Sequence, residues 1–146
     1  MSGRIVVSLL MGFTIFFGIA LYYFQVFAFY EKVKNLSSIE VSGLVIPVNN
    51  YVGIDSETSG LKLRGCFSAD PKLFETLPKL ENSTPLSAPF WFECFDNQKL
   101  QEDIDKGVLT VFMAKENEKD GIDRVIGIYP NGIGYQWRQL NAKYVD

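Results

Sequence analysis

The chain opens on a long apolar segment, residues 5–30, which reads IVVSLLMGFTIFFGIALYYFQVFAFY. The segment contains no charged residue and no proline. A helix rises about 1.5 Å per residue, so residues 5–24 alone would cover the roughly 30 Å of a bilayer's hydrocarbon. Three tyrosines gather toward its C-terminal end, where amphipathic rings favour the headgroup region. We therefore expect residues 1–30 to form a single transmembrane anchor.

Two other interpretations of this segment fit less well. A core helix of a soluble protein would carry a polar stripe, whereas this segment is apolar all round. A cleaved signal peptide would have an apolar region of about 7–15 residues that ends at a small-x-small site. The triplet of that kind, Gly18-Ile19-Ala20, lies inside the apolar run. An uncleaved anchor therefore remains the favoured interpretation.

The charges that flank the anchor do not fix its orientation. Arg4 and the terminal amine lie on one side, and Lys32 and Lys34 lie on the other beside Glu31, so the lysine and arginine bias is weak. The N-terminal tail is very short, and both cysteines follow the anchor. We expect the N-terminus in the cytoplasm of a bacterium, the helix in the inner membrane and the remaining chain in the periplasm.

The residues after the anchor suit one small domain. We expect a juxtamembrane connector over residues 31–38 and a periplasmic α+β domain over residues 39–146. All 17 acids and all 14 bases except Arg4 follow residue 30, so this part carries a net charge of −4. A mildly acidic domain lacks the basic face that nucleic acid requires, and it has no electrostatic attraction to anionic lipid.

The chain contains no histidine. This excludes a Ser-His-Asp triad, histidine zinc sites and histidine haem ligation. We find no phosphate-binding glycine loop and no calcium-loop spacing either. The sequence therefore predicts a protein that is not an enzyme and that holds no cofactor or metal.

Alternating and apolar runs predict a mainly antiparallel sheet. Strands are expected over residues 39–46, 61–67 and 108–114, with loops at positions 49–50 and 54–60. Asp70-Pro71 would open one short helix, and Asp96 or Asn97 would cap a second that runs to Lys106. Two apolar segments, residues 123–129 and 133–140, flank Pro130-Asn131-Gly132 and predict a C-terminal β-hairpin.

Cys66 and Cys94 lie 28 positions apart. In an oxidising compartment such a pair forms a disulfide by default, which would stabilise the fold by about 3–4 kcal/mol in the chain-entropy model. Two unrelated buried thiols are the alternative. The spacing excludes a redox pair of the C-x-x-C type.

Two kinds of residue are candidates for contact with other proteins. Small-x-x-x-small pairs, which allow a second membrane helix to approach closely, lie on different sides of the anchor at Ser8 and Gly12 and at Thr14 and Gly18. Ordinary membrane-helix composition explains such pairs equally well. In the domain, four aromatic residues could form the core or an exposed surface that meets a partner or the bilayer: Phe90, Trp91, Phe92 and Trp137.

Several stretches together resemble an uncharacterised family of short single-pass membrane proteins of alphaproteobacteria of the Rhodobacter and Roseobacter type. The matching pieces are residues 1–7, 21–25, 63–67, 91–96, 121–125, 129–132 and 135–141. The resemblance covers nearly the whole chain, but its motifs name no chemistry. It therefore implies a membrane-anchored protein without implying an activity.

These observations favour a non-catalytic accessory or assembly subunit of an inner-membrane complex, with a respiratory complex such as cytochrome c oxidase as host. Its partners would be an integral membrane protein complex and the lipid bilayer. The first alternative is a periplasmic sensor or small-ligand module with an apolar pocket lined by Trp91, Phe112 and Trp137. The second is an enzyme that uses carboxylates alone, such as Glu93 and Asp123.

Overall fold

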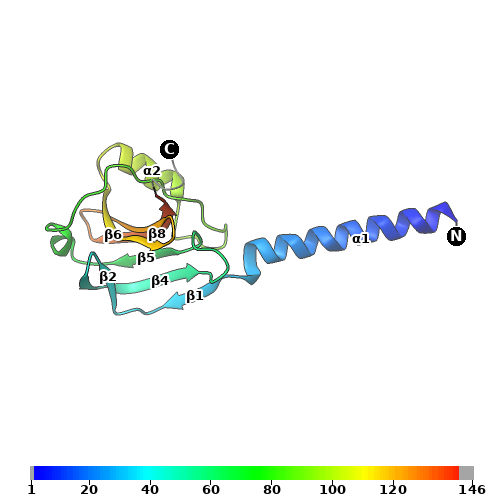
Figure 1. The fold of residues 1–146 in the computed structure, drawn as a ribbon, viewed down its shortest axis with the longest axis horizontal. Coiled ribbons are helices and arrows are strands. Elements are labelled where there is room, and N and C mark those ends of the chain that lie inside the picture. The colour runs from blue at the N-terminus through cyan, green and yellow to red at the C-terminus, as the bar shows by residue number, and fades with distance from the viewer. Residues whose placement is uncertain (1, 142–146) are drawn as a thin grey trace. The chain divides into compact units, whose positions relative to one another are not determined.

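A computed structural model describes residues 2–141, and the chain divides after Tyr30 into two compact units. The first unit is helix α1 (Gly3–Tyr23), which continues into a turn of π-helix, η1 (Phe24–Ala28) (Figure 1). Gly3–Ala28 is long and apolar enough to cross a membrane, and its most apolar window is not buried by any other part of the structure. The predicted N-terminal apolar helix is confirmed.

The second unit is built on a six-stranded sheet in which every pairing is antiparallel. Its spatial order is β1 (Glu31–Lys34), β4 (Asn49–Asp55), β5 (Arg64–Ser68), β8 (Ile133–Leu140), β7 (Ile122–Ile128) and β6 (Thr110–Lys119). A separate hairpin and two short helices complete the domain: β2 (Ser38–Val41), β3 (Leu44–Pro47), the 3-10 helix η2 (Pro71–Phe74) and α2 (Asn97–Asp105). The predicted α+β class with a mainly antiparallel sheet is confirmed.

The predicted C-terminal hairpin is formed by β7 and β8. Gly132 supplies the positive φ of the turn, +92°, and the Asn131 side chain accepts a hydrogen bond from the Ile133 N–H at 3.0 Å. Val125 then faces Trp137 across the pair. Because this turn sets the register, it decides which residues of both strands share a face.

Both short helices begin at the expected caps. The Asp70 carboxylate accepts from the Lys72 N–H at 3.0 Å, and the Asp96 carboxylate accepts from the N–H groups of Gln98 and Lys99 at 3.1 and 3.2 Å. Gly107 follows α2 with a φ of +76°. The capping residues thus satisfy amides that a helix cannot pair internally.

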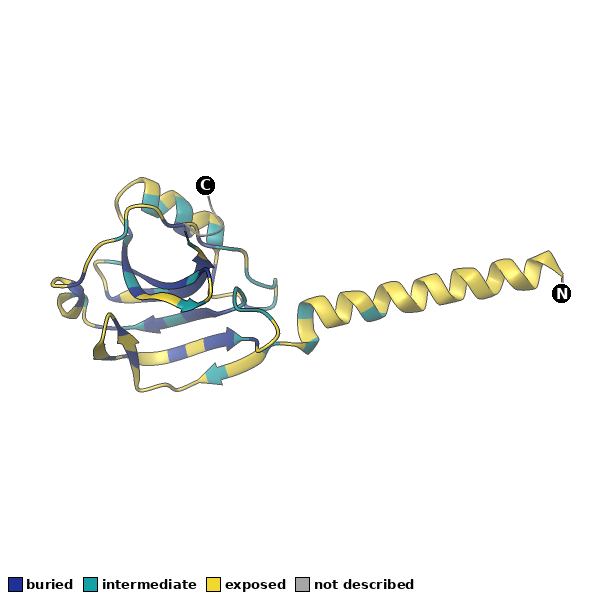
Figure 2. Cartoon of the chain, in the orientation of Figure 1, coloured by how far each residue is buried: buried dark blue, intermediate teal, exposed yellow. Residues whose placement is uncertain are grey.

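Successive strand residues point to opposite faces, so the register divides the sheet into two faces. The face that we call the hairpin face carries a buried cluster that includes Tyr51, Phe67 and Phe112 and is covered by β2, β3 and η2. The other, the helix face, carries Cys66 and Trp137 and is covered by the segment that contains α2 (Figure 1). Figure 2 shows how burial alternates along the strands between these covers.

Three local predictions were wrong. Residues 31–34, expected in a connector, form edge strand β1, whose Val33 packs against the core. Residues 39–46 are not one strand, because Ser42 and Gly43 adopt φ of +50° and +83° and turn the chain into the β2–β3 hairpin. Positions 49–50 and 54–55, expected in loops, belong to β4, because pairing on both sides outweighs the turn preference of its asparagines.

Candidate functional sites

The two cysteines of the chain form a disulfide, with Cα atoms 6.4 Å apart. Cys66 lies on the helix face of β5, and Cys94 lies in the aromatic segment that precedes α2. The bond therefore ties the cover of the helix face to the centre of the sheet. The predicted pairing is present, and the alternative of two free thiols is excluded.

The aromatic run before Cys94 is divided between core and surface. Phe92 is buried, Trp91 is half-buried, and Phe90 is 69% exposed. The Phe92 N–H donates to the Pro89 carbonyl at 2.9 Å, so the chain turns at this point. Of the three residues expected either in the core or on a partner surface, Phe92 belongs to the core and Phe90 to the surface.

Trp137 cannot belong to a partner surface, because its side chain is fully buried. It lies on β8, between β5 and β7 in the sheet, and its ring meets the Phe95 ring edge to face at a centroid distance of 6.0 Å. Its indole N–H donates to the Gln139 side chain at 3.1 Å. Trp137 therefore anchors the core of the helix face.

The predicted pocket of Trp91, Phe112 and Trp137 does not form. Phe112 is paired with Ile126 and Trp137 with Val125, and these neighbours on β7 point to opposite faces. Phe112 and Trp137 are therefore separated by the sheet itself. The sequence did not indicate this because it gives no register between β6 and β8, which do not touch.

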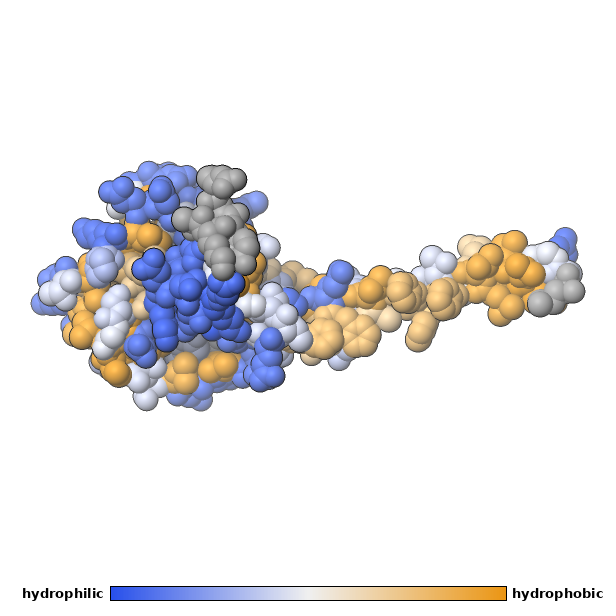
Figure 3. All heavy atoms as spheres, viewed as in Figure 1, coloured by the Kyte–Doolittle hydropathy of each residue, from blue (hydrophilic) through white to orange (hydrophobic). Residues whose placement is uncertain are grey.

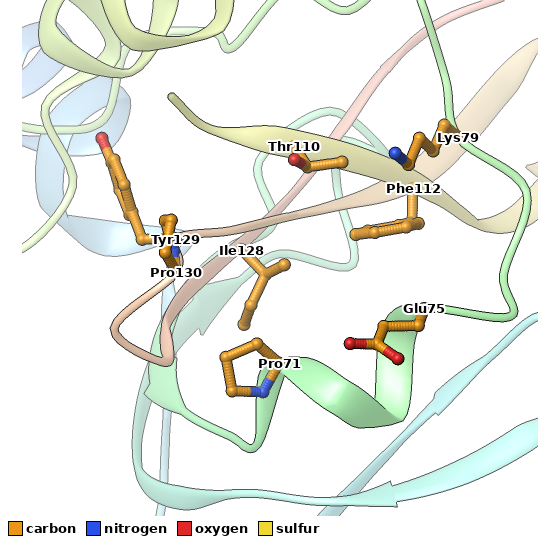
Figure 4. A pocket seen from close by; sticks show the side chains of 8 residues that line it. All are labelled: Pro71, Glu75, Lys79, Thr110, Phe112, Ile128, Tyr129 and Pro130. Carbon is orange, nitrogen blue, oxygen red and sulfur yellow. The ribbon is translucent and has the colours of Figure 1, made fainter. Parts of the chain in front are cut away.

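A small open pocket of about 240 Å³ lies instead at the end of the hairpin face (Figure 4). Phe112 and Ile128 contribute its buried part, and Tyr129 and Pro130 come from the end of β7 and the following turn. The other lining residues are Pro71, Glu75, Lys79 and Thr110. Ligand pockets usually enclose about 300–1,000 Å³, so this one suits a single side chain better than a metabolite.

A polar network lies on the hairpin face, at the end of the sheet away from η2. Arg124 Nε donates to both Glu118 oxygens at 3.1 Å, and Arg138 Nε donates to one of them at 3.0 Å. A terminal nitrogen of Arg138, on β8, also lies 3.0 Å from an Asp55 carboxylate oxygen, on β4, so this ion pair crosses β5. Burial would raise the pKa of Glu118, but the two guanidinium groups outweigh it and lower that pKa.

Neutral groups extend this network. Arg124 donates to the Gln136 side chain at 3.2 Å and to the Glu40 carbonyl at 2.8 Å. Gln136 in turn donates to the Tyr51 hydroxyl at 2.6 Å, and burial raises the pKa of that hydroxyl. All three nitrogens of the Arg124 guanidinium are thus used by the protein, so the network holds β2, β4 and β6 against the sheet centre.

Asp123 and Arg124 do not pair with each other, because adjacent strand residues face opposite ways. The Asp123 carboxylate accepts from the Asn117 N–H at 2.7 Å and from the Asn141 amide at 3.1 Å. It therefore orders the β6–β7 turn. Glu93, the other carboxylate considered for catalysis, is exposed within the aromatic run.

A third polar contact joins α2 to the sheet. The Asp103 carboxylate accepts from the Tyr129 hydroxyl and from Lys99 Nζ, the latter at 3.1 Å. The hydrogen bond from Tyr129, followed by that from Lys99, lowers the pKa of Asp103. Burial, reinforced by Asp103, raises the pKa of Tyr129. Across residues 2–141, no three His, Cys, Asp or Glu side chains are grouped so that they could hold a metal ion.

The four small residues of α1 are all exposed in the described chain. An added Cβ at Gly12 or Gly18 would meet no atom within 4 Å, and the Thr14 hydroxyl donates to the Leu10 carbonyl at 2.9 Å within the helix. Figure 3 shows the apolar side chains that cover this helix. The helix thus has open surface at both glycines.

The sequence alone does not reveal the polar network. The only local signal is that Gln136 and Arg138 alternate with Tyr135 and Trp137 in a strand that is buried on both faces. Paired charges are expected inside such a strand. Glu118, the acidic partner of Arg138, lies in an irregular part of β6. Because the register shifts there, strand alternation does not predict which face its side chain is on.

A family of unknown function, DUF6446, matches residues 33–145. The match therefore covers almost all of the domain and leaves out residues 1–32. No curated protein and no solved structure matches the chain.

Proposed function

The chain belongs to the DUF6446 family, and from this premise we propose that it is a non-catalytic accessory or assembly subunit of an inner-membrane protein complex. Its host would be a respiratory complex such as cytochrome c oxidase in an alphaproteobacterium. The helix would bind within the membrane, and the domain would cover part of the partner in the periplasm.

The observation that carries this proposal is the surface of α1. Gly12 and Gly18 leave open space on a helix that no other part of the described chain covers. In a bilayer such positions allow a second helix to pack at short distance, and van der Waals contact then stabilises the pair. A helix that only held the domain at the membrane could carry any apolar residue at these two positions.

Two further observations support the proposal. The disulfide between Cys66 and Cys94 fits an oxidising compartment, which favours the periplasmic side for the domain. The charges of Arg124, Arg138 and Glu118 are directed at one another, so this cluster supports a rigid fold and not a reaction.

A sensor or small-ligand module remains the second candidate. The pocket in Figure 4 supports it, since its wall combines apolar side chains with Glu75 and Lys79. Its volume, about 240 Å³, ranks it below the first candidate.

The decisive experiment purifies the tagged full-length chain in mild detergent and identifies the proteins that come with it. We expect a defined set of integral membrane proteins. Gly12→Leu and Gly18→Leu should each reduce their recovery, because a leucine side chain would fill the space that the partner helix occupies. Val6→Leu, at an exposed position about a third of a turn away from both glycines, serves as the matched control.

The proposal is wrong if the wild-type chain migrates alone at its own mass. It is also wrong if Val6→Leu weakens recovery as much as the two glycine variants do. A ligand-dependent change in tryptophan emission, without any co-purifying protein, would favour the sensor instead.

A further inference from the structure

Phe90 lies at the tip of a loop that is held on both sides. Before it, the buried Arg64 side chain donates to the carbonyls of Leu86 and Ser87, each at 3.1 Å. After it, Phe92 is buried and Cys94 is bonded to Cys66. These contacts fix the chain on both sides of Phe90, whose side chain is 69% exposed.

Residues of β1 and β4 lie next to this loop. Lys32 Nζ lies 5.5 Å from the centroid of the Trp91 ring. Lys34 shares the face of Lys32 by strand alternation, and its partner across the pair is Val52, which is 41% exposed. We call this surface the aromatic corner, which comprises Phe90, Trp91, Lys32, Lys34 and Val52.

The composition of the aromatic corner is that of a membrane interface. Tryptophan and phenylalanine rings favour the boundary between headgroups and acyl chains, and lysine can lay its stem on apolar surface while its ammonium group reaches water. An exposed phenylalanine on a fixed loop gains free energy when apolar surroundings replace water.

The covalent chain keeps the aromatic corner near the bilayer. Lys32 follows Ala28, the end of the apolar helix, by four residues. Four residues span at most about 14 Å when fully extended. If the helix crosses a membrane, Lys32 therefore lies close to that membrane's surface.

We propose that the aromatic corner docks into the headgroup region of the bilayer and holds the domain against the membrane. This inference rests on the membrane anchor of the proposed function. The domain as a whole carries a net charge of −4, which opposes attraction to anionic lipid. Docking is driven by the aromatic rings, and it therefore occurs on zwitterionic lipid and persists at high salt.

The experiment uses the full-length chain reconstituted into phosphatidylcholine vesicles, some made with lipids brominated near the headgroup. Bromine quenches nearby tryptophan, and the chain has two tryptophans, Trp91 in the aromatic corner and Trp137 in the core. We expect quenching in the wild type that is absent from Trp91→Phe, where only Trp137 reports. Phe90→Ser should reduce the quenching, whereas Val45→Ser, which alters a valine that is 73% exposed on β3, should not.

Two outcomes separate the docking from the anchor. If the chain resists alkaline extraction but the wild type is quenched no more than Trp91→Phe, the docking is wrong and the anchor stands. If alkaline washing releases the chain, the anchor fails and the docking fails with it. Phe90→Ser keeps Trp91 and changes an exposed side chain, so it tests the docking even if Trp91→Phe disturbs the fold.

Discussion

Replacing Glu118 by glutamine would test whether the polar network stabilises the domain. The carboxylate accepts three hydrogen bonds, two from Arg124 at 3.1 Å and one from Arg138 at 3.0 Å. A glutamine keeps the shape but is neutral and offers a single acceptor oxygen, so both guanidinium groups lose this charged partner and one of them also loses its hydrogen bond. A hydrogen bond to a charged group contributes about 1.5–3 kcal/mol.

The expected loss of unfolding free energy is about 2–3 kcal/mol. This lies below the roughly 3–5 kcal/mol for an uncompensated buried charge, because neither arginine is left alone. Arg138 keeps Asp55, and Arg124 keeps Gln136 and the Glu40 carbonyl. Urea unfolding of the full-length chain in non-ionic detergent measures the loss, with the fluorescence of buried Trp137 as the signal.

The pH dependence of the same variant provides a second test. The folded-state pKa of Glu118 is lowered, so its contribution is present above the unfolded-state pKa of about 4.3 and is lost as pH falls through the folded value. The difference in unfolding free energy between wild type and Glu118→Gln should therefore become smaller as the pH falls below about 4.3.

Glu116→Gln is the matched control, since Glu116 is exposed on the same strand. We expect it to change stability by less than about 0.5 kcal/mol. Equal stability of wild type and Glu118→Gln at neutral pH, or equal losses in both variants, would refute the reasoning.

Three further measurements address other parts of the domain. Replacing Cys66 and Cys94 together by serine should cost about 3–4 kcal/mol in urea unfolding, and a dithiol reductant should destabilise the wild type but not this variant. Gly65→Ala should lower the melting temperature, because its Cβ would lie 2.6 Å from the Tyr51 hydroxyl oxygen, and an unchanged melting temperature would contradict this packing argument. Tyr129 has a raised pKa, so the stability it contributes is present below its unfolded-state pKa of about 10 and is lost as pH rises. Tyr129→Phe should therefore reduce the loss of stability at alkaline pH. An unchanged dependence of stability on pH would count against the contact with Asp103.

The sequence by itself determined the elements whose signals are local. An uncharged apolar run is long enough to fix α1, Asp70 and Asp96 cap their helices, and the turn at Gly132 sets the C-terminal hairpin. Alternation also placed Cys66 and Arg64 on one side of β5, opposite Phe67. Each of these depends on residues close together in the chain, so propensity and pattern suffice.

Only the tertiary structure decided which strands meet and which face is buried. Residues 31–34 became a strand because β4 offered a partner, and Trp137 became core because a segment tied by the disulfide covers its face. Phe112 and Trp137 were separated because β7 lies between their strands. Arg124 pairs with Glu118 and not with Asp123, because side-chain direction follows from strand register and bulges. Register and bulges depend on two strands at once, so no single segment of sequence specifies them.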